Sequence, residues 1–331
     1  MDKTLEQYIF QAGDILAVCH IAPDGDAIGS LLGLGWALRQ LGKKYTLVCA
    51  DTIPEVYLFL PGSEKVVPRS TGEHDLLIAL DCSDRKRLGQ ACPTELLERV
   101  PIINIDHHVT NSKFGTVNWV DPFASATAEM VAELVGHLGL SLTLPLATCL
   151  LNGIVSDTRG FRTPNTTART LAMAIRLMEA GAPLAEIVER NFNRRSLSSM
   201  RLWAKVIDGI KLLDGRVIWG EITRQMRQEC GAAESDDGGL ANFLITAQEA
   251  DIAVVLTEKE DRVVDVSMRA GPGLDVSQVA VRLGGGGHPQ AAGCTIQGTL
   301  AEVREKVWAE VKRSLRALPP IIPEPGADEH K

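Results

Sequence analysis

The chain has 331 residues, of which 45% are hydrophobic and 23% charged, and its net charge is −8. This length suffices for two domains that each bury a core. The acidic balance excludes the broad basic surface with which proteins neutralise long nucleic acid, so a nucleotide ligand would be small and held by a local site.

Three further features of the composition indicate the compartment. Residues 1–14 include acidic positions and lack the basic start and long apolar run of a signal peptide. The longest apolar stretch, residues 27–38, is too short to span a bilayer. The seven cysteines are scattered, without a Cys-x-x-Cys pair, which argues against a zinc cage or a disulfide framework. We expect a cytoplasmic protein with reduced thiols and no membrane segment.

The first half of the chain alternates short apolar runs with helical stretches. An amphipathic helix is expected at about 28–41, and later helices at 126–138, 143–155, 166–180 and 184–191. Continuous apolar strands separated by helices are typical of a doubly wound α/β fold, whose parallel sheet is covered on both faces. The expected strands are 15–21, 45–50, 76–80 and 102–105.

The second half repeats the alternation in a smaller α/β unit. A connecting helix at about 194–210 leads into strands expected at 216–221, 252–257, 262–268 and 293–297, with helices at 240–250, 276–283 and 300–315. The proline-rich end predicts disorder. The expected parts are a first domain (1–192), a linker helix (193–213), a second domain (214–318) and a tail (319–331).

Histidines and aspartates gather directly after the expected strands. Because ligands of doubly wound sheets bind beyond the carboxyl ends of the strands, these separate segments converge on one crevice. Asp157, at the end of an expected helix, adds a further carboxylate. The residues at or just after the ends of these strands are His20, Asp24, Asp26, Asp81, Asp106, His107 and His108.

Four of these carboxylates would bring a charge of about −4, which two divalent cations balance. An oxygen-rich donor set with imidazoles suits Mn²⁺, Mg²⁺ or Co²⁺ better than Zn²⁺. Two ions roughly 3.5–4 Å apart can share a hydroxide and stabilise both oxygens of a phosphoester displacement. Taken singly, Asp81 and Asp157 would be turn or helix-cap residues; the combination predicts a two-metal phosphoesterase.

A second motif is glycine-rich, Gly284-Gly-Gly-Gly-His-Pro-Gln-Ala-Ala-Gly293. Its glycines leave backbone N–H groups open to a phosphate, and His288 supplies a side-chain donor. A flexible linker is the alternative, but linkers seldom run straight into an apolar strand. Arg269, at the end of an expected strand, could bind the same anion.

Together these motifs resemble the DHH phosphoesterase family with its DHHA1 accessory domain, over about residues 5–315. The resemblance implies that His20 and Asp24 bind a first metal, that Asp81 bridges, and that Asp26, His107 and Asp157 bind a second. His108 would contact the phosphate or assist the leaving group, and Asp106 would orient its neighbours. Arg269 and His288 would bind a terminal phosphate, with Gly285, Gly286 and Gly287 as its cradle. The resemblance thus implies a catalytic domain (1–192) and a substrate-binding domain (214–318), with the active site in the cleft between them. The family often has serine where this chain has Ala270, which removes one hydroxyl donor.

The resemblance is strongest to the branch that degrades very short oligonucleotides to nucleoside monophosphates and dephosphorylates 3′-phosphoadenosine 5′-phosphate. It implies two divalent cations, with Mn²⁺ favoured over Mg²⁺ or Co²⁺, and short single-stranded substrates rather than long duplexes. The sequence leaves open whether the protein forms a homodimer. Two alternatives also remain: a phosphodiesterase for cyclic di-AMP or linear pApA, and an inactive nucleotide sensor.

Overall fold

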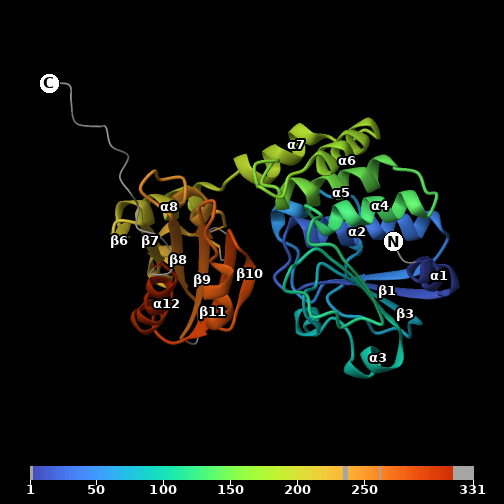
Figure 1. Cartoon of the computed structure of the whole chain (residues 1–331), viewed down its shortest axis with the longest axis horizontal. Coiled ribbons are helices and arrows are strands. Elements are labelled where there is room, and N and C mark those ends of the chain that lie inside the picture. The colour runs from blue at the N-terminus through green and yellow to red at the C-terminus, as the bar shows by residue number, and fades with distance from the viewer. Residues whose placement is uncertain (1–2, 234–237, 261, 316–331) are drawn as a thin grey trace. The chain divides into compact units, whose positions relative to one another are not determined.

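The computed structural model describes residues 3–233, 238–260 and 262–315. They form two compact units, and the chain passes from the first to the second between Arg194 and Arg195 (Figure 1). The tail expected to be disordered, 319–331, lies outside the described residues. Within the described ranges, no helix has both the length and the apolar character needed to cross a membrane.

The first unit is built on a five-stranded parallel sheet, which confirms the α/β class. Its register pairs Cys19 with Leu80 and Leu80 with Ile105, so these three strands end side by side. The fifth strand was not predicted, because all its residues are half-buried and lack a continuous apolar run. In spatial order the strands are β2 (Lys44–Val48), β1 (Asp14–Cys19), β3 (Leu76–Leu80), β4 (Ile102–Asp106) and β5 (Val117–Val120).

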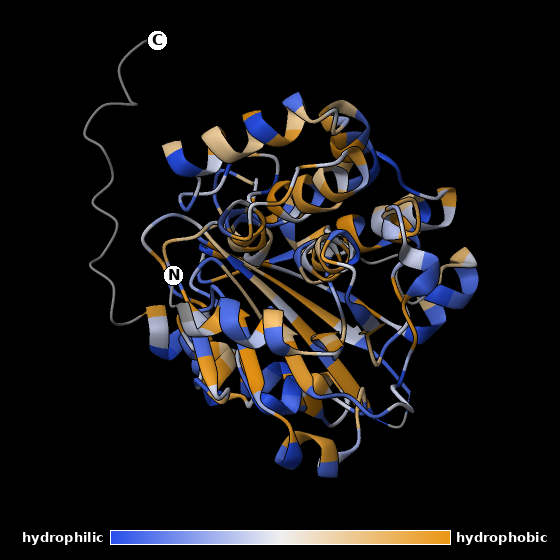
Figure 2. Cartoon of the chain, turned by 90° about the vertical axis from the view of Figure 1, so that its right-hand side faces the viewer, coloured by the Kyte–Doolittle hydropathy of each residue, from blue (hydrophilic) through white to orange (hydrophobic). Residues whose placement is uncertain are grey.

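Helices cover both faces of this sheet. Ile15 and Ala17 of β1 face a core shared with α2, α4 and α5, whereas Leu16 and Val18 face the opposite core with α3. The strands are accordingly hydrophobic along most of their length, and the helices alternate in hydropathy (Figure 2). The helices are α1 (Lys3–Gln11), α2 (Gly25–Gln40), α3 (Thr94–Arg99), α4 (Thr127–His137), α5 (Leu144–Asp157), α6 (Ala168–Glu179) and α7 (Leu184–Val188), which continues as a π-helical turn, Glu189–Asn193.

The second unit has a mixed six-stranded sheet in which only β7 and β8 pair in parallel. Helices α11 and α12 pack on one face and α8, α9 and α10 on the other. The helix expected at 240–250 is wrong in length, because α10 ends at Leu244. In spatial order the strands are β10 (Gly286–His288), β11 (Ala291–Gln297), β9 (Val263–Ala270), β8 (Ile252–Glu258), β7 (Val217–Ile222) and β6 (Lys211–Leu213); the helices are α8 (Leu197–Asp208), α9 (Arg224–Cys230), α10 (Leu240–Leu244), α11 (Ser277–Arg282) and α12 (Leu300–Leu315).

A Ser-His-Asp cluster at the amino end of β1 ties the 68–75 segment to the sheet. His74 Nδ1 lies 2.9 Å from Asp14 Oδ1 and its Nε2 lies 2.7 Å from Ser70 Oγ, while Lys44 Nζ lies 2.6 Å from Asp14 Oδ2. Ser70 is only 3% exposed, and its hydroxyl also accepts the Gly72 N–H. We therefore interpret this cluster (Asp14, Lys44, Ser70 and His74) as structural, and call it the latch because its bonds hold the 68–75 segment against the sheet.

The Asp14→Asn variant tests the latch. Burial raises the pKa of Asp14, but its hydrogen bonds to Lys44 and His74 outweigh this and hold the pKa below the ordinary 3.8. The stabilisation is therefore present above pH 3.8 and is lost as the pH falls through the lower folded-state value. We expect the variant to lose about 1 kcal/mol of unfolding free energy at pH 7. Urea unfolding at pH 7 and pH 3 should show this difference shrinking in acid, whereas an equal difference at both values would contradict the interpretation.

Candidate metal centre

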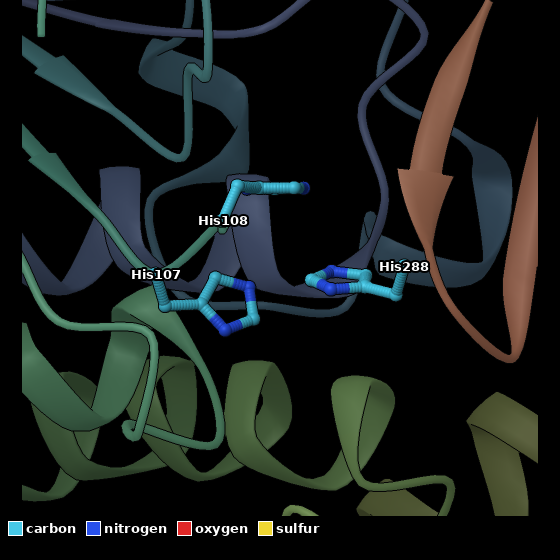
Figure 3. A group of neighbouring side chains, drawn as sticks. All are labelled: His107, His108 and His288. Carbon is cyan, nitrogen blue, oxygen red and sulfur yellow. The ribbon is translucent and has the colours of Figure 1, made fainter. Parts of the chain in front are cut away.

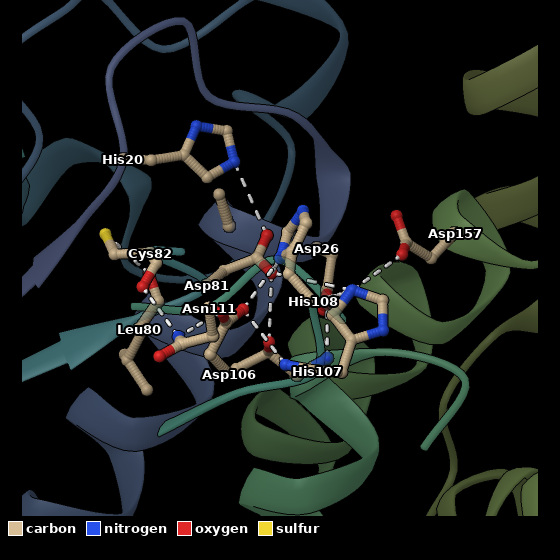
Figure 4. A network of polar contacts seen from close by, with 12 residues as sticks. His20, Asp26, Leu80, Asp81, Cys82, Asp106, His107, His108, Asn111 and Asp157 are labelled. Atoms are coloured by element: carbon tan, nitrogen blue, oxygen red, sulfur yellow. Dashed lines mark hydrogen bonds and ion pairs between the residues drawn. The ribbon is translucent and has the colours of Figure 1, made fainter. Parts of the chain in front are cut away.

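The residues that follow β1, β3 and β4 meet at the carboxyl edge of the first sheet, as the register requires (Figure 4). Asp24 and Asp26 join them from the start of α2, and Asp157 from the end of α5. The six proposed ligands of the sequence analysis are thus brought together in one unit: His20, Asp24, Asp26, Asp81, His107 and Asp157.

Asp81 is shared by two groups of donors. On one side, His20 Nε2 lies 3.4 Å from Asp81 Oδ2 and 3.9 Å from Asp24 Oδ1. On the other side, His107 Nε2 lies 3.6 Å from Asp81 Oδ1 and 3.8 Å from Asp26 Oδ2. In each group of three, donor atoms lie within 4.8 Å of one another. One carboxylate therefore presents a different oxygen to each of two sets of ligands.

The second group has a further carboxylate. Asp157 Oδ2 lies 3.1 Å from His107 Nε2, closer than the oxygens of Asp26 or Asp81. Three carboxylates thus converge on one ring nitrogen of His107, which is itself buried. Carboxylate and imidazole donors at this density are the ligands that divalent cations of the Mn²⁺ type take in proteins, so the residues fit the implied metal.

The backbone at Asp81 is left-handed, with φ of 58°. Aspartate tolerates this conformation better than most residues, although it is sparsely populated. The Asp81 N–H donates to Ile105 O, which ties the turn to β4 while the side chain reaches into the cluster. Strained backbone of this kind tends to occur at functional sites.

Helix starts hold the two aspartates of the His20-x-x-x-Asp24-x-Asp26 motif. Asp24 is the N-cap of α2, where its Oδ1 accepts the N–H groups of Asp26 and Ala27. The carboxylate of Asp26, which is fully buried, accepts the N–H of Thr127 at 2.6 Å and of Ala128 at 2.8 Å. The positive end of the α4 dipole therefore faces Asp26 and stabilises its negative charge.

A glycine in α5 makes room for this arrangement. A Cβ on Gly153 would lie 2.8 Å from Asp26 Oδ1 and 2.5 Å from Ala128 Cβ. Any larger residue would push Asp26 away from the start of α4. Sequence reasoning missed Gly153, because its role depends on a helix crossing rather than on a local motif.

The protonation of the metal-free cluster is set by burial and by mutual repulsion. Burial raises the pKa of Asp26, and the charges of Asp81 and Asp157 raise it further. Burial by itself would also raise the pKa of Asp81. The hydrogen bond to His20 and the positive charges of the neighbouring histidines outweigh burial, so the pKa of Asp81 is lowered. Burial alone would lower the pKa of His20, but Asp81 and Asp24 raise it to about 9. Protons on histidine thus balance part of the carboxylate charge when metal is absent.

Asp106 orients the pair of histidines that follows it. Its Oδ1 accepts from the His107 N–H at 2.9 Å and lies 2.7 Å from His108 Nδ1. Asn111 donates to its other oxygen and to the Asn104 side chain. His108 Nδ1 also lies 3.5 Å from Asp81 Oδ1, and the rings of His107 and His108 meet edge to face (Figure 3).

A buried polar network supports His107 from behind. His107 Nδ1 lies 3.3 Å from Ala124 O, which favours the tautomer that leaves Nε2 facing the carboxylates. The next residue, Ser125, donates both its N–H and its hydroxyl to Glu129 Oε2, and Thr170 donates to the same oxygen. Sequence patterns gave no signal for this network, since its members, from His107 to Thr170, lie far apart in the chain.

Part of the glycine-rich motif of the second unit forms a strand rather than the flexible linker that the sequence left as the alternative. Gly286, Gly287 and His288 form the edge strand β10, which pairs antiparallel with β11. A Cβ on Gly285 would lie 2.1 Å from Gly293 O, and one on Gly287 would lie 2.5 Å from Ala291 O. These two glycines are therefore required by close backbone packing, whatever they bind. His288 ends the strand and is half-buried.

Comparison with known proteins gives two domain matches. The DHH family N-terminal domain matches residues 14–154, and the DHHA1 domain matches residues 226–317. A Thermus thermophilus relative, the bifunctional oligoribonuclease and PAP phosphatase NrnA, is 38% identical over 92% of this chain and 90% of its own length.

The chain belongs to the DHH family.

Other relatives extend this result. The Bacillus subtilis bifunctional oligoribonuclease and PAP phosphatase NrnA is 28% identical over 92% of this chain and 93% of its own length. The cyclic-di-AMP phosphodiesterase PdeA of Listeria monocytogenes is 24% identical over 94% of this chain but only 49% of its own length. An exopolyphosphatase-related protein from Bacteroides fragilis has the same fold, with a TM-score of 0.86 at 23% identity and coverage of 94% and 95%. DHH phosphoesterases use divalent metals, in agreement with the donor set described above.

Thr127 is a residue of this DHH domain that sequence analysis missed. It is fully buried; its N–H donates to Asp26 and its hydroxyl donates to Asp81 Oδ1 at 3.0 Å. We expect Thr127→Val to weaken Mn²⁺ binding by roughly 10–100-fold, because it removes a bond that orients a ligand. Thr127→Ser, which keeps the hydroxyl, is the matched control. Calorimetric titration with Mn²⁺ measures both; equal affinities in the two variants would show that the hydroxyl does not matter.

Proposed function

We propose that this protein is a Mn²⁺-dependent phosphoesterase that cleaves short oligonucleotides to nucleoside monophosphates and 3′-phosphoadenosine 5′-phosphate to AMP. The observation that carries the proposal is the sharing of Asp81 between two donor groups, since two-metal sites of this kind serve phosphoester displacement. The Thermus and Bacillus relatives, whose names give both activities, support the choice of substrates.

Each ligand has a proposed place. His20, Asp24 and Asp81 would hold one ion; Asp26, His107 and Asp157, again with Asp81, would hold the other. Bound divalent ions supply a Lewis acid and lower the pKa of a bound water towards neutrality. Mn²⁺ suits this mixture of carboxylates and imidazoles best, with Mg²⁺ or Co²⁺ as alternatives.

His108 has a separate proposed role. Asp106 fixes its Nδ1, and its ring adjoins the ligands without needing to be one of them. From this position it would hydrogen-bond the scissile phosphate or transfer a proton to the leaving oxygen. In the second unit, Arg269 and His288, with the backbone of Gly285, Gly286 and Gly287, would bind a terminal phosphate of the substrate. Recognition of one end would make the cleavage exonucleolytic.

Substrate comparison tests the proposal. The panel with Mn²⁺ contains an RNA dinucleotide, a short RNA, a long single-stranded RNA, 3′-phosphoadenosine 5′-phosphate and cyclic di-AMP; chelated enzyme is the control. We expect rapid loss of the dinucleotide, the short RNA and the adenosine bisphosphate, while the long RNA and the cyclic substrate persist. Equal cleavage of short and long RNA would contradict the restriction to short chains.

A second candidate is a phosphodiesterase of cyclic di-AMP or linear pApA, which the Listeria relative favours. Preference for the cyclic substrate in the same panel would select it. An inactive nucleotide sensor is the third candidate, and it would be selected if none of the substrates in the panel were hydrolysed. Every proposed ligand is present here, which counts against the sensor.

The proposal also covers the cellular location of the protein and its oligomeric state. All seven cysteines are free thiols, which supports a reducing, cytoplasmic location. A homodimer stays a prediction, and sedimentation of the purified protein would test it.

A further inference from the structure

Arg269 is held in place by two hydrogen bonds within the second unit. Its Nε donates to Asn242 Oδ1 at 2.5 Å, and its Nη1 donates to Met268 O at 2.8 Å. Because these bonds engage two different nitrogens of one planar group, together they fix the plane of the guanidinium. The side chain is half-buried near the end of β9.

Asn242 is well placed to act as this anchor. It lies on α10, whose Leu240, Ala241 and Leu244 are buried in the core against β7 and β8. The helix therefore cannot shift without disturbing that core. Asn242 itself is half-buried and points to β9, 27 residues further along the chain.

A fixed guanidinium plane matters for binding phosphate. Arginine recognises phosphate through a rigid fork of N–H donors, and its strength depends on alignment of that fork with the oxygens. A free arginine side chain loses rotamer entropy when a ligand immobilises it, and this loss weakens binding. The bond to Asn242 imposes that order before substrate arrives, which favours binding.

We propose that Asn242 is a positioning residue that aligns Arg269 with a terminal phosphate of the substrate, and so creates a preference for phosphorylated ends. The inference rests on the proposed function, in which Arg269 binds that phosphate. It adds a residue for which neither the sequence motifs nor the metal chemistry gave a reason.

The test compares dinucleotides that carry a phosphate at the 5′ end, at the 3′ end or at neither end. For Asn242→Ala we expect KM to rise roughly tenfold on one of the phosphorylated substrates, with kcat nearly unchanged. KM for the unphosphorylated dinucleotide should stay the same. Thr246→Ala, an exposed change just beyond α10, is the matched control and should alter neither value.

A double-mutant cycle separates positioning from a general structural effect. If Asn242 acts through Arg269, Asn242→Ala should add little in an Arg269→Ala background. Additive losses, or equal losses on phosphorylated and unphosphorylated substrates, would overturn the inference.

Binding supplies a readout that does not need turnover. Calorimetric titration of the metal-loaded protein with AMP, the proposed product, which keeps a terminal phosphate and is not cleaved further, should show affinity reduced roughly tenfold in Asn242→Ala. Unchanged affinity would overturn the role of Asn242. A wild-type protein that binds this nucleotide but cleaves nothing would instead overturn the proposed function, while the comparison of variants still decides the role of Asn242.

Discussion

Asp81→Asn is expected to abolish turnover, with a loss in kcat on the order of 10³-fold or more, because the shared ligand contributes to both proposed ions and each is worth several kcal/mol. Asparagine keeps the shape of the side chain and tolerates the left-handed backbone at this position. The variant should therefore stay folded. Asp81→Ala should have the same effect on turnover, with an added strain of roughly 1–2 kcal/mol.

The measurement combines kinetics with metal titration. Asp81→Asn should bind Mn²⁺ more weakly at both sites, whereas loss of one other ligand should affect mainly one. Asp84→Asn, three residues away, is the matched control, since Asp84 caps a short 3₁₀ segment and lies outside the donor groups. Activity of Asp81→Asn close to wild type would refute the two-metal assignment.

Removal of metal is the second change with a large expected effect. Chelation should reduce hydrolysis to background, and excess Mn²⁺ should restore it. Bound metal should also stabilise the folded protein, by about 2.7 kcal/mol for one site when the free metal concentration is a hundred times Kd. For a unit of this size, at 2–4 °C per kcal/mol, that corresponds to a rise of roughly 5–11 °C in Tm.

The Tm shift should be confined to the first unit, which carries all six proposed ligands. Arg269→Ala, in the second unit, is a suitable control, because it should leave the Mn²⁺-dependent shift intact. A protein that stays fully active after exhaustive chelation would contradict the proposed mechanism. Restoration by Mg²⁺ or Co²⁺ but not by Mn²⁺ would correct only the choice of ion.

The sequence allowed much of the metal centre to be predicted because its ligands follow buried parallel strands. His20, Asp81 and Asp106 each come directly after an apolar run, and parallel register brings such positions together. Thr127, Gly153 and the bond between Asn242 and Arg269 had no comparable signal. Their roles arise where helices meet other elements, which local periodicity does not encode.

The glycine-rich motif did have a sequence signal, but that signal suggested the wrong local structure. A run of glycines predicts exposed backbone and a loop, yet Gly286 and Gly287 pair with β11. Glycine is needed here because two backbones approach too closely for a Cβ, and that approach is visible only in three dimensions.

The bond between Asp26 and the start of α4 joins residues 101 positions apart in the chain. Contacts of such separation require the closure of a long loop, which costs chain entropy and slows folding. The ligand groups therefore do not exist in the unfolded chain, unlike those of small zinc modules that fold around their ion. Metal loading should follow folding rather than drive it, and refolding rates in the presence of chelator and of Mn²⁺ should be the same.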